Sequence, residues 1–272
     1  MEIKFYKEKA KEIRNKVLDI CTEAKTGHVA SSFSCIELLV GLYYNILKYD
    51  PLLPEWKERD RFVLSKGHAS PALYAILADT GFFPEEWLWE MCKKDGYIGI
   101  HTQKNVLGIE ASTGSLGHGF GIAIGMALAA KMNNEEYFTF VLLSDGECYE
   151  GAIWEGAMFA GHHNINNIVA IVDRNWQCAT DFTEDCIRLE PLDDKWRAFG
   201  WDVKRIDGHS FEDIFVALKD VRSKRGKPLV IIADTVKGKG VDFIEHQVLW
   251  HTRVPKGDQV EEAKRQLEEV LE

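Results

Sequence analysis

The stretch from residue 138 to residue 177 constrains the fold more than any other part of the sequence. It opens with the apolar, β-prone run Phe138–Leu143, continues with helical spacing over 150–163, and closes with a second apolar run, Ile168–Val172. Two short buried runs joined by a helix are typical of a βαβ unit with parallel strands. A polar turn follows each run, so both turns are expected at the sheet edge where open α/β proteins bind their ligands.

These two turns carry a carboxylate and an amide. Asp145 and Gly146 follow the first run, and Asn175 follows the second. Carboxylate and amide oxygens suit Mg²⁺, which takes few protein ligands and completes its octahedron with phosphate and water. Gly146 has no side chain, so its backbone can approach a phosphate closely near a helix N-terminus. Each turn alone is also consistent with an ordinary end of a strand, but their pairing favours a metal–phosphate site.

Composition and charge restrict the class of protein. With 46% hydrophobic residues among 272, the chain can bury the core of one large α/β domain, and its net charge of −10 argues against a nucleic-acid partner. No apolar run reaches the ~20 residues that a membrane span needs, and the charged N-terminus does not resemble a signal peptide. The six cysteines contain no Cys-x-x-Cys pair, so we expect reduced thiols and a cytoplasmic protein.

The remaining sequence extends the α/β pattern. Ser34 and Glu37 predict a capping box that opens a helix to about Leu47, and Ser210 with Asp213 predicts a second capped helix. Further strands are expected within 59–68, 201–206 and 229–234, and further helices over 5–25, 120–132, 191–199 and 258–271. The prediction is an α/β fold with a mostly parallel sheet and helices on both faces.

Several segments resemble transketolases. Ser144-Asp145-Gly146 followed by Asn175 is similar to the thiamine diphosphate motif, usually written Gly-Asp-Gly, about thirty residues, then Asn. Glu150-Gly151 and the small-residue helix after it are similar to transketolase specifically. Three more stretches resemble the same family: the Arg-Phe-x-Leu-Ser-x-Gly-His segment at 61–68, Thr-Gly-x-Leu-Gly at 113–117, and Lys-Gly-x-Gly with a later Trp-His at 237–251.

The resemblance implies a thiamine diphosphate-binding fold and a role for each matching residue. Asp145, Asn175 and the main-chain carbonyl of Gln177 would hold Mg²⁺. The cofactor would be bound by His68, Gly114, Leu116, Gly146, Glu150, Asn175 and His251, with Glu150 at an interface between subunits. Ser144 stands where the motif has its first glycine, which is tolerable if its φ is negative.

The resemblance also implies that His28, His101 and His251 act on the substrate. His101 lacks the usual Gly-His-Pro context, and Thr252 after His251 replaces a glycine. Near neutral pH, imidazoles can donate hydrogen bonds and transfer protons. His209, beside an Asp-Gly turn, is interpreted as a structural histidine, and His246 has no counterpart in the family pattern.

The similarity covers roughly residues 10 to 265 and one of the three domains of a transketolase. The chain is therefore expected to be a single diphosphate-binding domain (1–272), with an N-terminal helical pair (5–47) and a C-terminal helix (258–271). The implied function is that of the N-terminal subunit of a split transketolase, which transfers a two-carbon ketol unit from a ketose or its phosphate to an aldose or its phosphate. The implied partner is a C-terminal subunit with the pyrimidine-binding and C-terminal domains, in an A₂B₂ complex.

Other functions stay open at this point. One is a subunit of another thiamine diphosphate carboligase, similar to deoxyxylulose phosphate synthase or specialised for an unusual sugar. An oxo-acid dehydrogenase α-chain fits less well, because such chains lack this set of histidines. The third is a non-catalytic binding subunit, which the intact set of matching residues disfavours.

Overall fold

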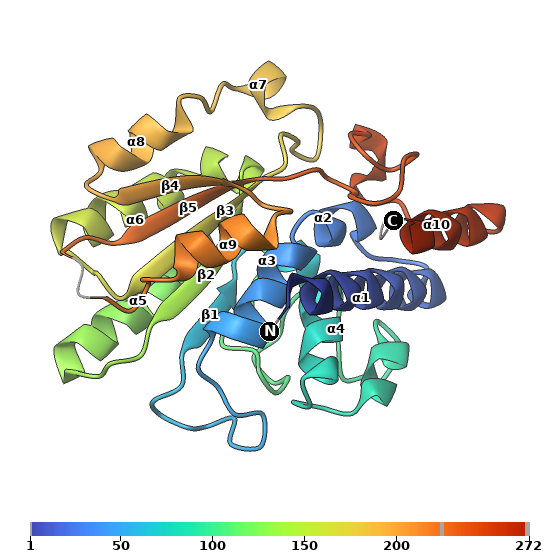
Figure 1. Ribbon diagram of the computed structural model, residues 1–272, viewed down its shortest axis with the longest axis horizontal. Helices are drawn as coiled ribbons and strands as arrows, with labels where there is room; N and C mark the ends of the chain where they lie inside the picture. The colour runs from blue at the N-terminus through green and yellow to red at the C-terminus, as the bar shows by residue number, and fades with distance from the viewer. Residues whose placement is uncertain (1, 224–225, 270–272) are drawn as a thin grey trace.

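A single parallel sheet forms the centre of the molecule (Figure 1). The structure is a computed structural model in which residues 2–223 and 226–269 are described. The five strands lie in the order β1-β2-β3-β5-β4, and every neighbouring pair is parallel. Their bounds are Arg61–Leu64 (β1), Thr139–Ser144 (β2), Ile168–Arg174 (β3), Asp202–Asp207 (β4) and Leu229–Asp234 (β5).

Helices cover both faces of this sheet. Those with helical bounds are α1 (Ile3–Ala24), α2 (Val29–Phe33), α3 (Ile36–Gly41), α4 (Ser70–Asp79), α5 (His118–Asn133), α6 (Gly151–His162), α7 (Thr183–Cys186), α8 (Leu192–Ala198), α9 (Phe211–Leu218) and α10 (Asp258–Glu269). Short 3₁₀ segments occupy Gly67–Ala69, Glu85–Glu90, Gly146–Tyr149 and Val248–His251. The predicted fold class is confirmed. Of the predicted C-terminal helix 258–271, positions 270 and 271 lie outside the described residues.

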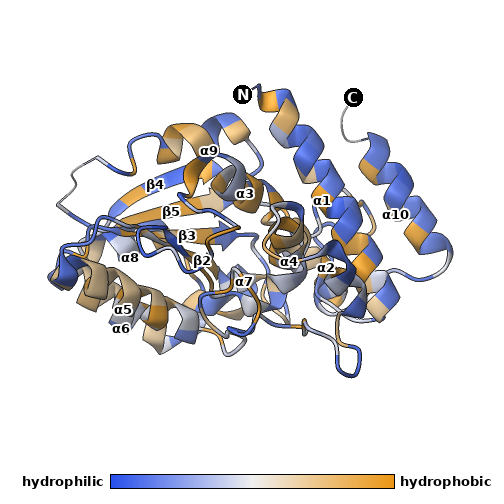
Figure 2. Ribbon diagram, turned by 90° about the horizontal axis from the view of Figure 1, so that it is seen from below, coloured by the Kyte–Doolittle hydropathy of each residue, from blue (hydrophilic) through white to orange (hydrophobic). Residues whose placement is uncertain are grey.

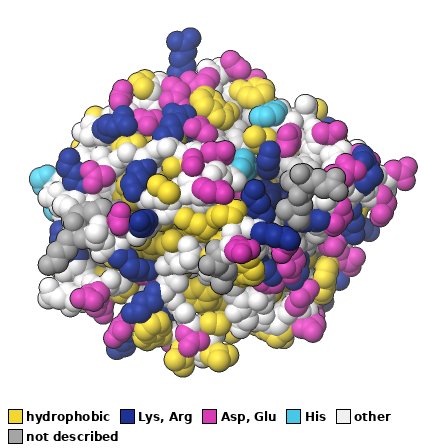
Figure 3. All heavy atoms as spheres, viewed as in Figure 1, with side chains coloured by type: hydrophobic (Ala, Val, Ile, Leu, Met, Phe, Trp, Pro, Cys, Tyr) yellow, Lys and Arg dark blue, Asp and Glu magenta, His cyan; other side chains and the backbone are white. Residues whose placement is uncertain are grey.

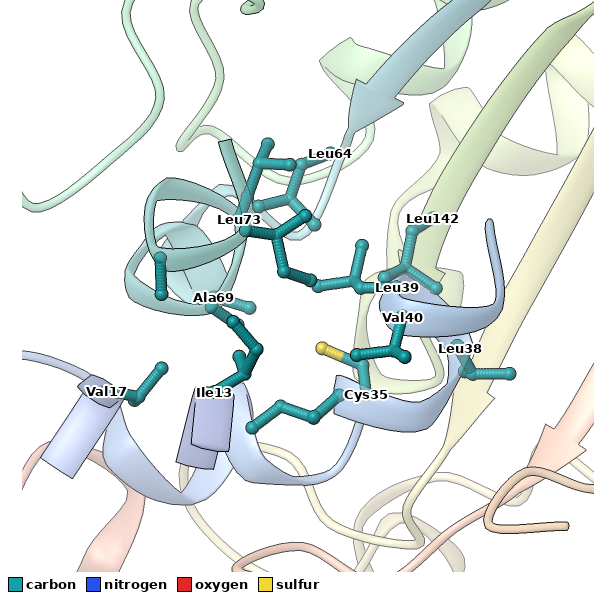
Figure 4. Packing of buried hydrophobic residues seen from close by; sticks show 14 of the residues in the cluster. Ile13, Val17, Cys35, Leu38, Leu39, Val40, Leu64, Ala69, Leu73 and Leu142 are labelled. Atoms are coloured by element: carbon teal, nitrogen blue, oxygen red, sulfur yellow. The ribbon is translucent and has the colours of Figure 1, made fainter. Parts of the chain in front are cut away.

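Two hydrophobic cores result, one on each face. Alternate residues of a strand point to opposite faces, and β3 follows this rule: Val169 and Ile171 pack with α1, α3 and α4, whereas Ala170 and Val172 pack with α5, α6 and α8. Figure 4 shows the first core, where side chains of α1, α3 and α4 meet Leu64 and Leu142 of the sheet. Figure 2 shows the apolar strands enclosed between the two helical layers.

The predicted capping box at Ser34 is wrong. The Ser34 hydroxyl donates to Asp173 Oδ2 at 2.6 Å, and Glu37 forms an ion pair with Arg14 and a hydrogen bond with His209. Helix α3 instead begins at Ile36 without a side-chain cap, and it ends at Gly41, where one π-helical turn continues the chain. Charge-assisted bonds to buried ions outweigh a neutral cap. The cap at Ser210 is confirmed, because its hydroxyl accepts the N–H of Asp213 at 3.1 Å.

Among the described residues, no helix combines the length and apolar character required to cross a membrane. On the face shown in Figure 3, lysine and arginine side chains are interspersed with acidic ones.

Candidate functional site

The carboxyl ends of the central strands open into a cavity of about 470 Å³. Segments far apart in the sequence meet there. The predicted residues that line it are His28, His68, His101, Gly114, Leu116, Gly146, Asn175, Gln177 and His251. Asp145 is completely buried beside this lining, whereas Glu150 is exposed and lies outside it.

The two predicted turns meet as the βαβ unit requires. Ser144 is in register with Asp173, and the Asp145 N–H donates to the Asp173 carbonyl at 3.2 Å. Asp145 is followed by the 3₁₀ turn that leads into α6, so Gly146 lies near the beginning of a helix. Ser144 is not among the residues with positive φ, so it replaces the usual glycine without backbone strain.

Oxygen atoms suited to a hard cation gather at this edge. Asp145 Oδ1 accepts a hydrogen bond from the Gly146 N–H at 2.7 Å, and Asn175 Oδ1 accepts one from the Gln177 N–H at 3.2 Å. An oxygen with one donor keeps acceptor capacity. Burial raises the pKa of Asp145 to about 6, and Arg174, at 3.0 Å, counteracts part of that rise. A divalent cation would compensate the buried carboxylate, so this donor set fits Mg²⁺.

Arg174 is a site residue that the sequence analysis did not identify. Its fully buried guanidinium forms ion pairs with Asp145, Glu184 and Glu190, and it stacks on the Trp176 ring, 3.8 Å from the ring centroid. Trp176 has a φ of 67°, which is uncommon for a bulky residue. Its N–H donates to Asp145 Oδ2 at 2.7 Å, so this strained turn helps to hold the carboxylate in place.

Two further buried carboxylates fix the floor of the cavity. Asp173 pairs with the fully buried Lys66, and although burial would raise its pKa, this lysine and two hydroxyls bring it below the usual value. Glu147 accepts hydrogen bonds from Ser65, from the Gly117 N–H at 2.8 Å and from the Ser144 N–H at 3.1 Å. Glu147 thereby joins the ends of β1 and β2 to the glycine-rich turn before α5.

Four histidines that line the cavity form a cluster. The ring centroids of His28, His68 and His251 lie 5.3 to 5.4 Å from one another, and that of His101 lies 6.0 Å from His28. Burial is the main cause that lowers the pKa of His28 to about 4 and that of His251 to about 3, and it holds the pKa of His68 well below its ordinary value. These three rings are therefore neutral at pH 7.

Polar atoms without a partner lie beside the cluster. Among the described residues, His28 Nδ1 and Ser31 Oγ are buried and form no hydrogen bond, and both residues line the cavity. Buried polar groups are nearly always hydrogen-bonded, so these atoms indicate a site built for a polar ligand. Gly114, with a φ of 148°, keeps the wall open, since a Cβ there would lie 3.3 Å from the His101 ring.

Lys237 is a second site residue that sequence reasoning missed. Its Nζ donates to the Cys178 carbonyl at 3.0 Å and lies 2.9 Å from His251 Nδ1. Burial lowers its pKa to about 8. The only signal in the sequence is its place at the head of the Lys-Gly-Lys-Gly turn.

His209 has the structural surroundings that were expected. Its Nε2 accepts the N–H of Val236 at 2.8 Å, so in the neutral ring Nδ1 carries the proton and donates to Glu37 Oε2 at 3.0 Å. His209 and His246 both lie outside the cavity lining.

The chain is similar to known proteins over most of its length. The chain matches the family described as "Transketolase, thiamine diphosphate binding domain" over residues 5–269. It is 39% identical over 272 residues to an apulose-4-phosphate transketolase subunit of Phocaeicola vulgatus, covering 100% of this chain and 97% of that protein. It is 43% identical over 243 residues to 6-deoxy-6-sulfo-D-fructose transketolase subunit SqwG of a Clostridium species, covering 89% and 88%.

A solved structure has the same fold. The crystal structure of transketolase from Campylobacter jejuni superposes with a TM-score of 0.94 at 30% sequence identity, over 98% of this chain. This chain spans only 43% of the length of that transketolase.

Proposed function

The chain belongs to the transketolase family, through its thiamine diphosphate-binding domain, and from this premise we propose that it is the N-terminal subunit of a split transketolase. The reaction is the transfer of a two-carbon ketol unit from a ketose to an aldose. Relatives named as transketolase subunits, which this chain matches over 88 to 97% of their length, support this assignment.

The observation that carries the proposal is the cavity itself, which brings a buried acid–amide edge together with a cluster of neutral histidines. We assign Mg²⁺ to Asp145, Asn175 and the Gln177 carbonyl, and the diphosphate to His68, Gly146 and the cation of Lys237. Main-chain groups of Gly114 and Leu116 are assigned to the aminopyrimidine ring. Thiamine diphosphate, when bound, supplies the nucleophilic carbon that forms and breaks the bond to the sugar.

The histidines of the cavity are assigned to the sugar. His28, His101 and His251 are placed to hydrogen-bond its hydroxyl groups, and a neutral imidazole can accept a hydroxyl proton. His28 Nδ1, buried without a partner, is the atom best placed to act as a base. Because the histidine rings of the cluster are neutral, they favour binding of a neutral polyol over binding of a second anion beside them.

Substrate and assembly follow from the relatives' names and from the exposed face of the domain. One relative is named for apulose 4-phosphate and another for 6-deoxy-6-sulfofructose, so a specialised sugar, phosphorylated or sulfonated, fits as well as a common pentose phosphate. We propose a single diphosphate-binding domain that works in the cytoplasm with a separate subunit bearing the pyrimidine-binding and C-terminal domains, in an A₂B₂ complex. Glu150, exposed at the start of α6, is assigned to the cofactor at that interface.

Titration of the purified chain with thiamine diphosphate, with and without Mg²⁺, tests the proposal. Wild type should bind in a Mg²⁺-dependent manner. Asp145→Asn, which keeps the shape and removes the charge, should weaken binding by about tenfold or more, about 1.4 kcal/mol. Asn175→Ala should weaken it less, since an amide contributes less than a carboxylate to a hard cation.

The exposed Asp185→Asn is the matched control and should bind normally. Affinity of the Asp145→Asn chain within about threefold of wild type would contradict the metal assignment.

A further inference from the structure

The loop over 177–187 places two thiols side by side at the rim of the cavity. Cys178 Sγ and Cys186 Sγ lie 3.5 Å apart, and both residues line the cavity. Cys186 is exposed and Cys178 is partly exposed, in contrast to Cys35 and Cys148, which are buried. The function proposed above uses neither thiol.

The backbone of this loop holds the two sulfurs near each other. The Cys178 N–H donates to the Asp181 carbonyl at 3.0 Å, and the Cys186 N–H donates to the Phe182 carbonyl at 3.1 Å. Thr180 Oγ1 contacts both sulfurs, at 3.3 Å from Cys178 Sγ and 3.6 Å from Cys186 Sγ. Since a disulfide bond is about 2.0 Å long, the sulfurs need to approach by roughly 1.5 Å.

We propose that Cys178 and Cys186 are a redox-active dithiol that hydrogen peroxide closes to a disulfide. Either sulfur attacks an oxygen of the peroxide. The O–O bond breaks, one water leaves, and that cysteine becomes a sulfenic acid. The other sulfur then attacks the sulfenic sulfur, the S–S bond forms, and a second water leaves. Two electrons pass from the thiols to hydrogen peroxide, and all hydrogens end in the two waters.

The dithiol lies next to groups already assigned to the cofactor. The link between the dithiol and cofactor binding rests on the proposed function. Lys237 Nζ faces the carbonyls of Gln177 and Cys178 at 3.5 and 3.0 Å. A ligand in the cavity and a displacement of Cys178 toward Cys186 therefore act on the same backbone. Suppose that bound cofactor shifts the equilibrium from the disulfide toward the dithiol by some factor. By linkage, oxidation to the disulfide then lowers the affinity of the chain for the cofactor by the same factor.

Peptide mapping after treatment with hydrogen peroxide tests the dithiol. The wild-type chain and the Cys92→Ser variant, which removes another exposed thiol, should each lose two hydrogens and yield a peptide cross-linked between positions 178 and 186. A reductant should restore both thiols. Cys178→Ser and Cys186→Ser should each lose this cross-link, and with glutathione disulfide each should form a mixed disulfide at the remaining thiol of the pair.

Two results separate this inference from the proposed function. If the wild-type chain is oxidised only at single cysteines, or cross-links at other positions, the dithiol is refuted. The 178–186 cross-link can also form at the same rate with and without saturating thiamine diphosphate and Mg²⁺. That result supports the redox-active dithiol and contradicts the assignment of the cofactor to this cavity. Slower cross-linking in the presence of both ligands supports both.

Discussion

Some of the charges buried at the floor of the cavity are balanced in pairs, whereas Glu147 and Lys237 have no ion-pair partner among the described residues. Lys66 pairs with Asp173, and Arg174 pairs with Asp145. Within the described part of the chain, Lys237 has only neutral hydrogen-bond partners, the Gln177 and Cys178 carbonyls and His251. An unpaired buried charge is costly unless a ligand of opposite charge compensates it. Lys237 is therefore the residue whose protonated form benefits most from a bound diphosphate.

Replacing Lys237 with methionine should separate binding from stability. Cofactor affinity should fall about tenfold, since one cation facing the diphosphate is lost. Thermal stability should stay the same or rise, because an uncompensated buried charge is removed. Lys239→Met, two positions on at a partly exposed site, is the control and should leave affinity unchanged. Unaltered affinity in Lys237→Met, measured by titration, would remove this residue from the cofactor site.

The histidine cluster should make the protein less stable toward acid. In the unfolded chain a histidine titrates near pH 6.5, whereas in the fold the pKa is about 4 for His28 and about 3 for His251. Between these values the unfolded chain binds more protons, so the free energy of unfolding falls as pH decreases below about 6.5. Each ring contributes at most about 1.4 kcal/mol per pH unit. Asp145, with a pKa raised to about 6, acts in the opposite direction over about pH 6 to 4.

Chemical denaturation at pH 7, 6 and 5 measures this slope. His28→Asn should flatten the loss of stability relative to wild type. Exposed His162→Asn is the control and should follow the wild-type curve. If His28→Asn and wild type lose stability in parallel, His28 is protonated as readily in the fold as in the unfolded chain.

At the residue level, the groups that follow strand ends and turns could be predicted from the sequence. Asp145, Asn175 and His68 were found because each follows an apolar run whose register brings it to one edge. Arg174 and Lys237 were missed because their positions depend on burial, which a basic residue in a polar loop does not reveal. The capping box failed for a related reason: Asp173, 139 residues away from Ser34, takes its hydroxyl.

Among the helices, α6 shows how glycine permits close packing between elements. A Cβ on Gly161 would lie 1.8 Å from the Phe199 carbonyl oxygen, which follows α8. By contrast, nothing lies within 4 Å of a Cβ on Gly125 in α5. The small-residue character of both helices was visible in the sequence. Which glycines touch another element of the same chain was not, because that depends on helix positions in space.

Gly161→Ala and Gly125→Ala should therefore have opposite effects on stability. Overpacking against a backbone oxygen should destabilise the Gly161→Ala chain by about 1–3 kcal/mol. Gly125→Ala should stabilise the isolated chain by up to about 1 kcal/mol, because alanine favours a helix. Urea denaturation of the two variants checks both signs. Equal stability of the Gly161→Ala chain and wild type would mean that the end of α6 does not pack against the residues that follow α8.

For the whole molecule, the face formed by α5 and α6 is unusually apolar for a surface. Ile122, Met132, Met158 and Phe159 on these helices are between 39 and 73% exposed. Side chains of this kind are buried at interfaces between subunits. The small residues beside them permit close approach of a second protein chain. The exposed Glu150 lies at the N-terminus of α6, near the cavity.

The isolated chain should have no transketolase activity even when saturated with Mg²⁺ and thiamine diphosphate. In the proposed split arrangement, the pyrimidine-binding domain that completes the cofactor site belongs to the partner subunit. Adding the matching C-terminal subunit should restore aldose formation and shift the complex to a larger size in chromatography. Met158→Glu should abolish this complementation while leaving cofactor binding by the chain intact. Steady turnover by the chain alone would refute the split arrangement.

The strand order has a consequence for how the chain folds during synthesis. β5 lies between β3 and β4, so β4 has no strand to pair with until residues 229–234 leave the ribosome. Earlier in synthesis, β1 has no strand to pair with until β2 has been made, since Arg61 pairs with Thr139. Such long-range parallel pairing is slow and leaves strand edges unpaired in the meantime. Between the synthesis of β3 and that of β5, the nascent chain therefore has at most a partial sheet of β1, β2 and β3, and β5 then joins β3 to β4.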